Sequence, residues 1–200
     1  MMSAEFWNQR YAETAFAYGE EPNAFFAEQL MRLTPGQLLL PAEGEGRNAV
    51  FAARQGWQVT AFDLSATAKE KCTQLAAKHQ VAVHFEIDDA ALFLYGEEKY
   101  DAIALVFAHF PPELRWQVHQ QAAAALKPGG ILILEAFTPA QLHYNSGGPK
   151  EISMLYTAST LRQDFHPLQV QYCEEVLTTL DEGPYHQGMA AVVRLVAKKP

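Results

Sequence analysis

The sequence predicts an α/β protein whose helices cover both faces of a doubly wound, mostly parallel β-sheet. Apolar, strand-like runs alternate with helical stretches from residue 38 to residue 137, the pattern of parallel strands joined by helices. The run at 100–107 is apolar almost throughout, as in a strand that helices cover on both sides. The chain closes with two long strand-like runs, 168–180 and 189–198, around turn residues that predict an antiparallel hairpin. Five parallel-type strands and this hairpin make a seven-stranded sheet.

Length and composition predict one domain over residues 1–200. The chain has 200 residues, of which 49% are hydrophobic, and no repeat or linker interrupts it. The formal net charge of −8 and the lack of a Lys/Arg run disfavour broad nucleic-acid binding and attachment to an anionic membrane. No apolar stretch is long enough to span a bilayer, and Cys72 and Cys173 form no metal-binding spacing. We therefore expect a cytoplasmic protein without a membrane or nucleic-acid partner, while the oligomeric state stays open.

Residues 1–36 are rich in aromatic side chains and predict a helical cap. Ser3 can cap a short helix that carries Trp7 and Tyr11 on one face, four residues apart. Asn23 can cap a second helix over 24–33. The aromatic side chains either pack a terminal helix against the domain or form a lid over a positively charged ligand. Their density before the first strand favours the lid.

The stretch that follows predicts a nucleotide-binding turn. An apolar run, 38–40, enters a loop that holds Gly44 and Gly46, and a helix over 47–54 then ends before Gly56. Glycine lets the backbone approach a ligand closely, and the start of a helix presents free N–H groups to it. Tight strand-to-helix turns also need glycine for steric reasons, so this motif alone does not establish binding.

The next two strands each end in acidic residues. The strand over 58–62 leads to Asp63 and Leu64, about 20 residues after the glycine turn, where dinucleotide folds place the acid that binds a ribose diol. NAD and S-adenosylmethionine both carry such a ribose. A helix beginning at Ser65 precedes the strand over 81–87, which ends in Asp88-Asp89-Ala90. These are either turn residues or acceptors for the amino group of an adenine.

The second half of the chain alternates in the same way. The strand over 100–107 leads to His109, a helix runs over 113–126, and a strand over 131–137 follows. Residues 138–156 read as an irregular polar loop, and a short helix begins near Ser159.

These features together resemble the class I S-adenosylmethionine-dependent methyltransferases. The resemblance rests on the glycine loop, the acid at the end of strand two, LKPGG at 126–130 and the terminal hairpin, and it covers nearly the whole chain. More narrowly, FW…RYA…AYGEEPN followed by GEGRNA is similar to the bacterial tellurite-resistance and thiopurine-type methyltransferases. It implies a Rossmann-like methyltransferase fold with S-adenosyl-L-methionine, and not NAD, as cofactor.

The resemblance also implies which residues bind the cofactor. The implied set is Trp7, Tyr11, Glu43, Gly44, Gly46, Asn48, Asp63, Leu64, Asp88, Asp89, Ala90 and Phe107. The family's loop has an acid and a further glycine where this chain has Leu40 and Ala42. The acid normally helps to hold the methionine ammonium group, and either Glu43 or a backbone carbonyl can replace it here.

The chemistry of methyl transfer limits what the acceptor side must contain. Transfer from a sulfonium is an in-line displacement, so positioning supplies much of the rate and a thiolate or chalcogen oxyanion needs no base. A hydroxyl or amine acceptor needs a base. We predict His109 as the catalytic residue, because it follows the fourth strand. The candidate substrate-binding residues are Phe110, His143, Tyr144, Lys150 and Tyr156.

Three functions fit the sequence. The leading prediction is methyl transfer to a small molecule with a soft nucleophile. The alternatives are a protein or RNA methyltransferase and a non-catalytic S-adenosylmethionine-binding module. No cluster of potential metal ligands suggests a metal site.

Overall fold

The computed structural model describes residues 3–200 and contains one seven-stranded sheet in the order β3-β2-β1-β4-β5-β7-β6. The strands are β1 Gln37–Pro41, β2 Gln58–Asp63, β3 His84–Ile87, β4 Tyr100–Val106, β5 Leu126–Phe137, β6 Gln169–Asp181 and β7 Gln187–Lys198. Strands β1 to β5 pair in parallel, whereas β7 is antiparallel to both β5 and β6. The predicted fold class, a mostly parallel sheet that ends in an antiparallel hairpin, is confirmed.

Four of the α-helices in residues 3–200 begin at a residue whose side chain caps them. The α-helices are α1 Ala4–Arg10, α2 Ala24–Leu30, α3 Arg47–Arg54, α4 Ala66–Lys78, α5 Pro112–Ala125 and α6 Ala158–Asp164, with short 3-10 helices η1 Pro139–His143 and η2 Ile152–Met154. Ser3, Asn23 and Ser65 accept hydrogen bonds from the first turns of α1, α2 and α4, as predicted. Thr157 caps α6.

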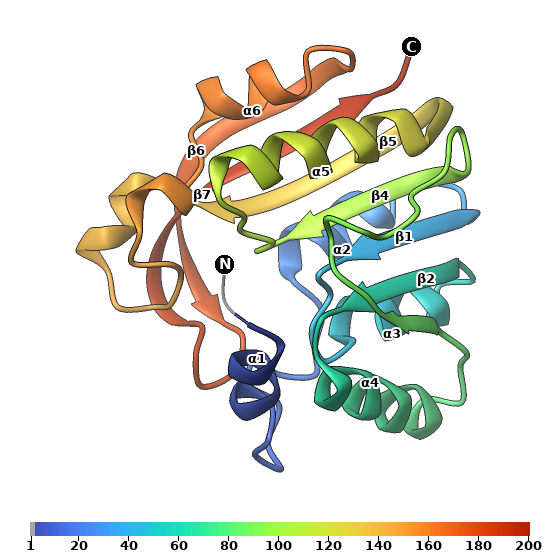
Figure 1. The fold of residues 1–200 in the computed structure, drawn as a ribbon, viewed down its shortest axis with the longest axis vertical. Coiled ribbons are helices and arrows are strands. Elements are labelled where there is room, and N and C mark those ends of the chain that lie inside the picture. Colours follow the sequence, from blue (N-terminus) through green and yellow to red (C-terminus); the bar gives the residue numbers. More distant parts are fainter. Residues whose placement is uncertain (1–2) are drawn as a thin grey trace.

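Two apolar cores lie on opposite faces of the sheet (Figure 1). Alternate residues of each strand point to opposite faces, so Leu39 joins the core under α5 and α6, while Leu38 and Leu40 join the core under α2, α3 and α4. Strand β4 divides in the same way, which explains why its sequence is apolar almost throughout.

Two strands, β3 and β5, begin three or more residues away from their predicted first residues. Strand β3 begins at His84 and not near residue 81, because the N–H of Val81 donates to the carbonyl of Ala76 at the end of α4 and is not available to a sheet. Strand β5 begins at Leu126, the first residue of LKPGG, and not at residue 131, because Tyr100 pairs with Leu126 before an irregularity in the β4–β5 register. In both cases the apolar pattern located the strand but not its first residue.

The topology places one crevice at the centre of the sheet. Strand β1 lies between β2 and β4, so the strand order reverses there, and ligands of such sheets bind beyond the carboxyl ends of the strands at that point. Figure 1 shows α1 and the irregular segment after β5 beyond these strand ends. Within residues 3–200, no helix is both long and apolar enough to cross a membrane.

Candidate functional site

A cavity lies at the carboxyl ends of β1, β2 and β4 and brings together most of the predicted site residues. Those that line it are Trp7, Tyr11, Glu43, Gly44, Asn48, Asp63, Leu64, Asp88, Asp89, Ala90, Phe107, His109 and Phe110. They come from α1, from the loops after four strands and from α3, so residues that are distant in the sequence face one space.

The two loop glycines have different roles. Gly44 lines the cavity with φ of 68°, and a Cβ there would lie 2.9 Å from the hydroxyl of Tyr11. Gly46 has φ of 92° but does not line the cavity; a Cβ there would lie 2.3 Å from Sγ of Cys72 in α4. Gly46, which was predicted to contact the ligand, thus lies outside the cavity lining. Gly46 instead permits α3 and α4 to pack closely.

Asp63 is held in place at the end of β2 by backbone donors. The N–H of Gly44 donates to Oδ2 at 3.0 Å, and the N–H of Ser65 donates to Oδ1 at 3.0 Å. Burial raises the pKa of Asp63 to about 6, against the effect of these hydrogen bonds. The carboxylate is thus oriented by the loop and keeps unused lone pairs for a ligand with two hydroxyl groups.

Glu43 is a second carboxylate at the cavity, half-buried and near the start of α3. Its Oε1 accepts from the N–H of Ala49 at 2.8 Å, and its Oε2 accepts from Nδ2 of Asn48 at 3.3 Å. Burial raises the pKa of Glu43 to about 7. The neighbouring Glu45 is already neutralised, because Nζ of Lys71 lies 2.6 Å from its Oε1. Of the two loop glutamates, only Glu43 lacks a cationic partner among residues 3–200.

The acidic pair after β3 lines the cavity at its far side. Oδ1 of Asp88 accepts from the N–H of Asp89, and Oδ1 of Asp89 accepts from the N–H of Ala91, each at 2.8 Å. Both side chains therefore shape their own turn, as one of the two interpretations of the sequence expected. Each also retains a second oxygen.

Aromatic rings form the walls between these polar ends. Phe107 has φ of 52°, unusual for a residue with a side chain, and its ring stacks on Phe137 with centroids 4.6 Å apart. Trp7 and Tyr11 of α1 stack on each other at 5.6 Å. Asn8 ties this helix to α4, since its Oδ1 accepts from Oγ of Ser65 at 2.6 Å.

His109 lines the cavity, but its two nitrogens are occupied by the backbone. Nδ1 donates to the carbonyl of Met154 at 2.7 Å, and Nε2 accepts from the N–H of Phe137 at 3.1 Å. Burial lowers the pKa of His109 to about 4, so the ring is neutral near pH 7. The predicted role as a base does not fit this geometry, because the lone pair that would take a proton already accepts a hydrogen bond. His109 instead fastens the end of β5 to the loop before Leu155.

Four predicted substrate residues lie outside the cavity lining. His143 and Lys150 are exposed and Tyr144 is half-buried, whereas Tyr156 is fully buried. The hydroxyl of Tyr156 accepts from the N–H of Phe110 at 2.7 Å and donates to the carbonyl of Ala108 at 3.1 Å, so it braces the loop after β4. The irregular loop does reach the cavity, but through Gly148, Pro149 and Met154.

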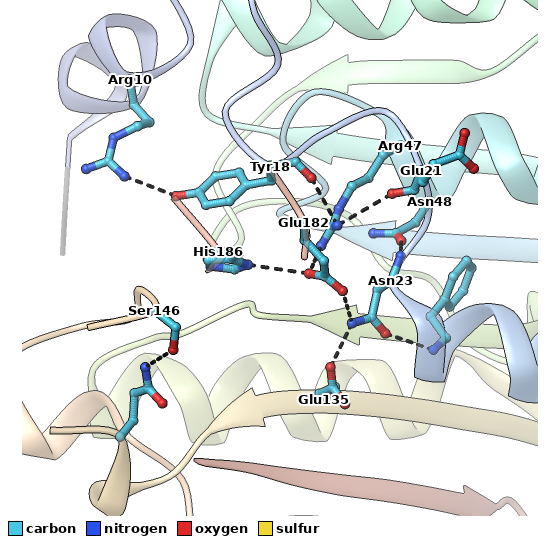
Figure 2. Close-up of polar contacts among 12 residues, drawn as sticks. Arg10, Tyr18, Glu21, Asn23, Arg47, Asn48, Glu135, Ser146, Glu182 and His186 are labelled. Carbon is cyan, nitrogen blue, oxygen red and sulfur yellow. Dashed lines mark hydrogen bonds and ion pairs between the residues drawn. The ribbon is translucent and has the colours of Figure 1, made fainter. Parts of the chain in front are cut away.

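Sequence reasoning missed a polar network beside the cavity (Figure 2). Glu182, in the turn between β6 and β7, accepts from Arg47 Nη2 at 2.7 Å and from Asn23 Nδ2 at 2.9 Å, and Nδ1 of His186 lies 3.5 Å from Oε2 of Glu182. Asn23 Nδ2 also donates to Glu135 at 2.7 Å. Arg47 and His186 line the cavity. The sequence marks 181–184 only as a turn, and no local pattern indicates where a turn docks.

No group of three or more His, Cys, Asp or Glu side chains in the described part of the chain is arranged to hold a metal ion. The candidate site is therefore built from carboxylates, aromatic rings and backbone N–H groups.

Comparison with known proteins gives a consistent result. A model of the "Methyltransferase domain" family matches residues 41–130. The chain is 32% identical over 166 residues to "Probable thiol methyltransferase 2" of Arabidopsis thaliana, covering 81% of this chain and 70% of that protein. It is also 32% identical over 154 residues to "27-O-demethylrifamycin SV methyltransferase" of Amycolatopsis mediterranei (strain S699), covering 68% of this chain but only 56% of that relative.

Solved structures share the fold. TehB from Haemophilus influenzae aligns with a TM-score of 0.73 at 16% identity, covering 98% of this chain and 67% of that one. At this level of identity the likeness concerns the fold alone.

Proposed function

Because the chain belongs to the class I S-adenosylmethionine-dependent methyltransferases, we propose that it transfers the methyl group of this cofactor to a small molecule with a soft nucleophile, a thiol or a chalcogen oxyanion. The observation that carries the proposal is one cavity in which the half-buried Glu43 follows β1, the buried Asp63 ends β2, and aromatic side chains form a wall beyond β4. The polar end suits the cofactor, and the apolar wall suits an acceptor of low charge density.

The residues at the polar end fit S-adenosylmethionine. Gly44 leaves room that a Cβ would fill, Asp63 offers two oxygens to a ribose diol, and Glu43 offers an anion to the ammonium group. Glu43 thus takes the role of the acid in the family's loop, whose position is occupied by Leu40 in this chain. A pyrophosphate, as in NAD, would place its negative charge against Glu43 and Asp63, so these carboxylates favour the sulfonium cofactor.

The chain's own residues supply position and exclude water. When bound, S-adenosylmethionine supplies a methyl group on a positively charged sulfur. Phe107 and the stacked Trp7 and Tyr11 present ring faces, which attract a cation and shield it from water. Phe110, Phe137 and Met154 line the same space and leave an apolar pocket beside it.

A soft acceptor is the kind that least requires a base from the loop after β4. His109 has no free nitrogen, so the residue after β4 cannot deprotonate a weakly acidic acceptor. Thiols ionise far more readily than alcohols and are strong nucleophiles. The name of the relative "Probable thiol methyltransferase 2" supports the same class of acceptor.

Two measurements test the proposal. Calorimetry should show binding of S-adenosylmethionine and its demethylated product and no binding of NAD. Asp63→Asn should weaken cofactor binding by about 1–3 kcal/mol, since a buried polar contact loses its charged partner. Asp181→Asn, at an exposed position of β6, is the matched control and should bind like the wild type. Binding of NAD alone would refute the assignment of the cofactor.

The acceptor class is then tested by cofactor consumption. We expect turnover with thiols, selenite or tellurite and none with small amines. Cofactor binding without consumption of any of these would indicate a different acceptor class and contradict the soft-nucleophile proposal.

A further inference from the structure

Two histidines line the cavity, and only one has a ring nitrogen free. His109 uses both nitrogens in backbone hydrogen bonds. His186 uses Nδ1 toward Glu182, whereas its Nε2 has no hydrogen-bond partner among residues 3–200. Nε2 of His119 also lacks a partner but is sealed in the core; Nε2 of His186 is not sealed, and its ring lines the cavity. His186 is therefore the cavity-lining histidine that keeps an imidazole nitrogen without a hydrogen bond among residues 3–200.

The turn between β6 and β7 fixes the direction of this ring. The N–H of Glu182 donates to the carbonyl of His186 at 2.9 Å, and the N–H of His186 donates to the carbonyl of Gly183 at 3.2 Å. Glu182 is itself held by Arg47 and Asn23 (Figure 2). Because the carboxylate is anchored from two sides, the imidazole that points Nδ1 at it has a defined orientation.

The charges around the ring define its protonation. Burial acts to raise the pKa of Glu182, but hydrogen bonding and the positive charge of Arg47 outweigh burial and lower it to about 2. The pKa of His186 is lowered, chiefly by burial. The positive charges of Arg47 and Arg10 also lower it, whereas Glu182 acts to raise it. Tyr18, which is neutral, packs on the ring at 4.5 Å, and His109, also neutral, lies across Phe137. Near pH 7 the carboxylate is ionised and the imidazole is neutral with its proton on Nδ1.

The neighbours of His186 belong to the acceptor side of the cavity. Its ring meets Phe107 edge-to-face at 4.6 Å and Phe137 at 5.3 Å. These rings form the apolar wall in which the proposed acceptor would lie. The His186 ring, whose Nε2 can accept a hydrogen bond, thus packs directly against this apolar wall.

We propose that His186 is the general base for thiol acceptors, oriented by Glu182, and this inference rests on the proposed function. The S–H proton passes to Nε2, and the sulfur lone pair forms the new bond to the methyl carbon. The bond between that carbon and the sulfonium sulfur breaks, and its electron pair returns to this sulfur, which leaves as a neutral thioether. The imidazolium, paired with Glu182, then releases its proton to water.

The first test compares thiols of different acidity. His186→Gln removes the base but keeps a side chain that can bond to Glu182, and His166→Gln, at an exposed position after α6, is the control. For thiols that are largely un-ionised at the working pH, His186→Gln should lower kcat/KM by roughly 10²–10⁴-fold. For thiols already ionised in solution it should lower kcat/KM only slightly. An equal loss for both kinds of thiol would assign His186 a purely structural role and overturn the inference.

The second test needs no turnover. An arylthiol whose thiolate absorbs at longer wavelength than its neutral form is bound to the wild type in the presence of the demethylated cofactor. The thiolate band should appear on binding below the pKa of the free thiol, and it should be lost in His186→Gln. If the variant fails to fold, the measurement on the wild type is sufficient by itself. The absence of a thiolate band in the wild-type complex would refute the inference.

The two proposals fail in different ways. Suppose that the cofactor binds and ionised thiols are methylated, but His186→Gln lowers kcat/KM equally for un-ionised and ionised thiols. His186 is then not the base, and the proposed methyl transfer to a soft nucleophile stands. If no thiol binds or reacts while the cofactor binds, the proposed acceptor class is wrong and the role of His186 falls with it.

Discussion

At the scale of single residues, Glu43 makes cofactor binding depend on pH. Its pKa is raised to about 7 by burial, so near neutrality it is partly protonated and must ionise to meet the ammonium group of the cofactor. Cofactor affinity should therefore rise as the pH increases from about 6 to about 8 and then level off. Calorimetry in buffers of different ionisation enthalpy should detect the proton released on binding.

A matched pair of variants assigns this effect. Glu43→Gln should weaken binding by about 1–3 kcal/mol above pH 7 and remove the rise around pH 7. Glu113→Gln, at an exposed position of α5, should change neither. An unchanged pH profile in Glu43→Gln would place the titrating group elsewhere. Because the pKa of Glu43 is raised from its ordinary value near 4.5 to about 7, the stability of the ligand-free protein should fall as the pH rises from about 4.5 to about 7 and then level off.

The sequence predicted these residues unevenly, for physical reasons. Asp63 was predicted because it ends a strand at a fixed spacing after the glycine turn, whereas Glu43 was predicted because it stands in the glycine loop near Leu40, which occupies the position of the family's acid. His109 was located correctly, but its role was not, because the partners of its nitrogens come from Phe137 and Met154, far along the chain. His186 was missed because nothing beside it in the sequence indicates that its turn reaches the cavity.

At the scale of elements, the glycine loop combines a binding function with a packing function. Gly44→Ala should leave the protein folded but abolish cofactor binding, since its Cβ meets Tyr11 at the cavity. Gly46→Ala should mainly reduce stability, because its Cβ meets the backbone and side chain of Cys72 in α4. Both variants also carry the cost of a left-handed backbone, about 1–2 kcal/mol.

Gly188→Ala separates these contributions. Gly188 has φ of 100°, but a Cβ there would meet nothing within 4 Å. The variant therefore carries the backbone cost without a clash. Thermal unfolding should rank Gly46→Ala as less stable than Gly188→Ala. If the two variants unfold at the same temperature, the close packing of α3 on α4 does not explain why glycine is needed at position 46.

Helix α1 was predicted to form a lid over the bound ligand. Its sensitivity to trypsin tests this prediction. Trp7 and Tyr11 line the cavity, so a cofactor bound there would contact the helix and hold it closed. Cleavage after Arg10 should slow markedly on addition of S-adenosylmethionine and not on addition of NAD. Asn8→Ala removes the tie to Ser65 and should speed cleavage without cofactor. Equal protection with and without cofactor would leave Trp7 and Tyr11 as packing residues.

At the scale of the whole molecule, the sheet was predictable and the docking of its hairpin was not. Strands β1, β2, β4 and β5 contribute side chains to the cores on both faces, so their apolar runs and the helices between them determine a parallel sheet. The β6–β7 turn contacts residues near the other end of the chain: the N–H of Tyr185 donates to the carbonyl of Ala17, and Asn23 reaches Glu182. Such contacts depend on complementary shape and charge that no local pattern records.

The Glu182 network should therefore contribute to the stability of the fold as a unit. One carboxylate joins the hairpin to α3 through Arg47 and to the start of α2 through Asn23. Removing one member of a buried ion pair leaves the other charge uncompensated, so Glu182→Gln should reduce the free energy of unfolding by about 3–5 kcal/mol near pH 7. Glu174→Gln, on an exposed position of β6, should change it by less than about 0.5 kcal/mol.

The pH dependence of this loss identifies its cause. The pKa of Glu182 is lowered to about 2 in the folded protein, below its ordinary value near 4.5, so its ionised form stabilises the fold above about pH 4.5. That contribution disappears as the pH falls through about 2. Denaturant unfolding should therefore show the difference between wild type and Glu182→Gln shrinking steadily from pH 5 towards pH 2. A difference that stays constant over this range would mean that the variant acts through packing, and that the charge of Glu182 does not hold the hairpin to the rest of the molecule.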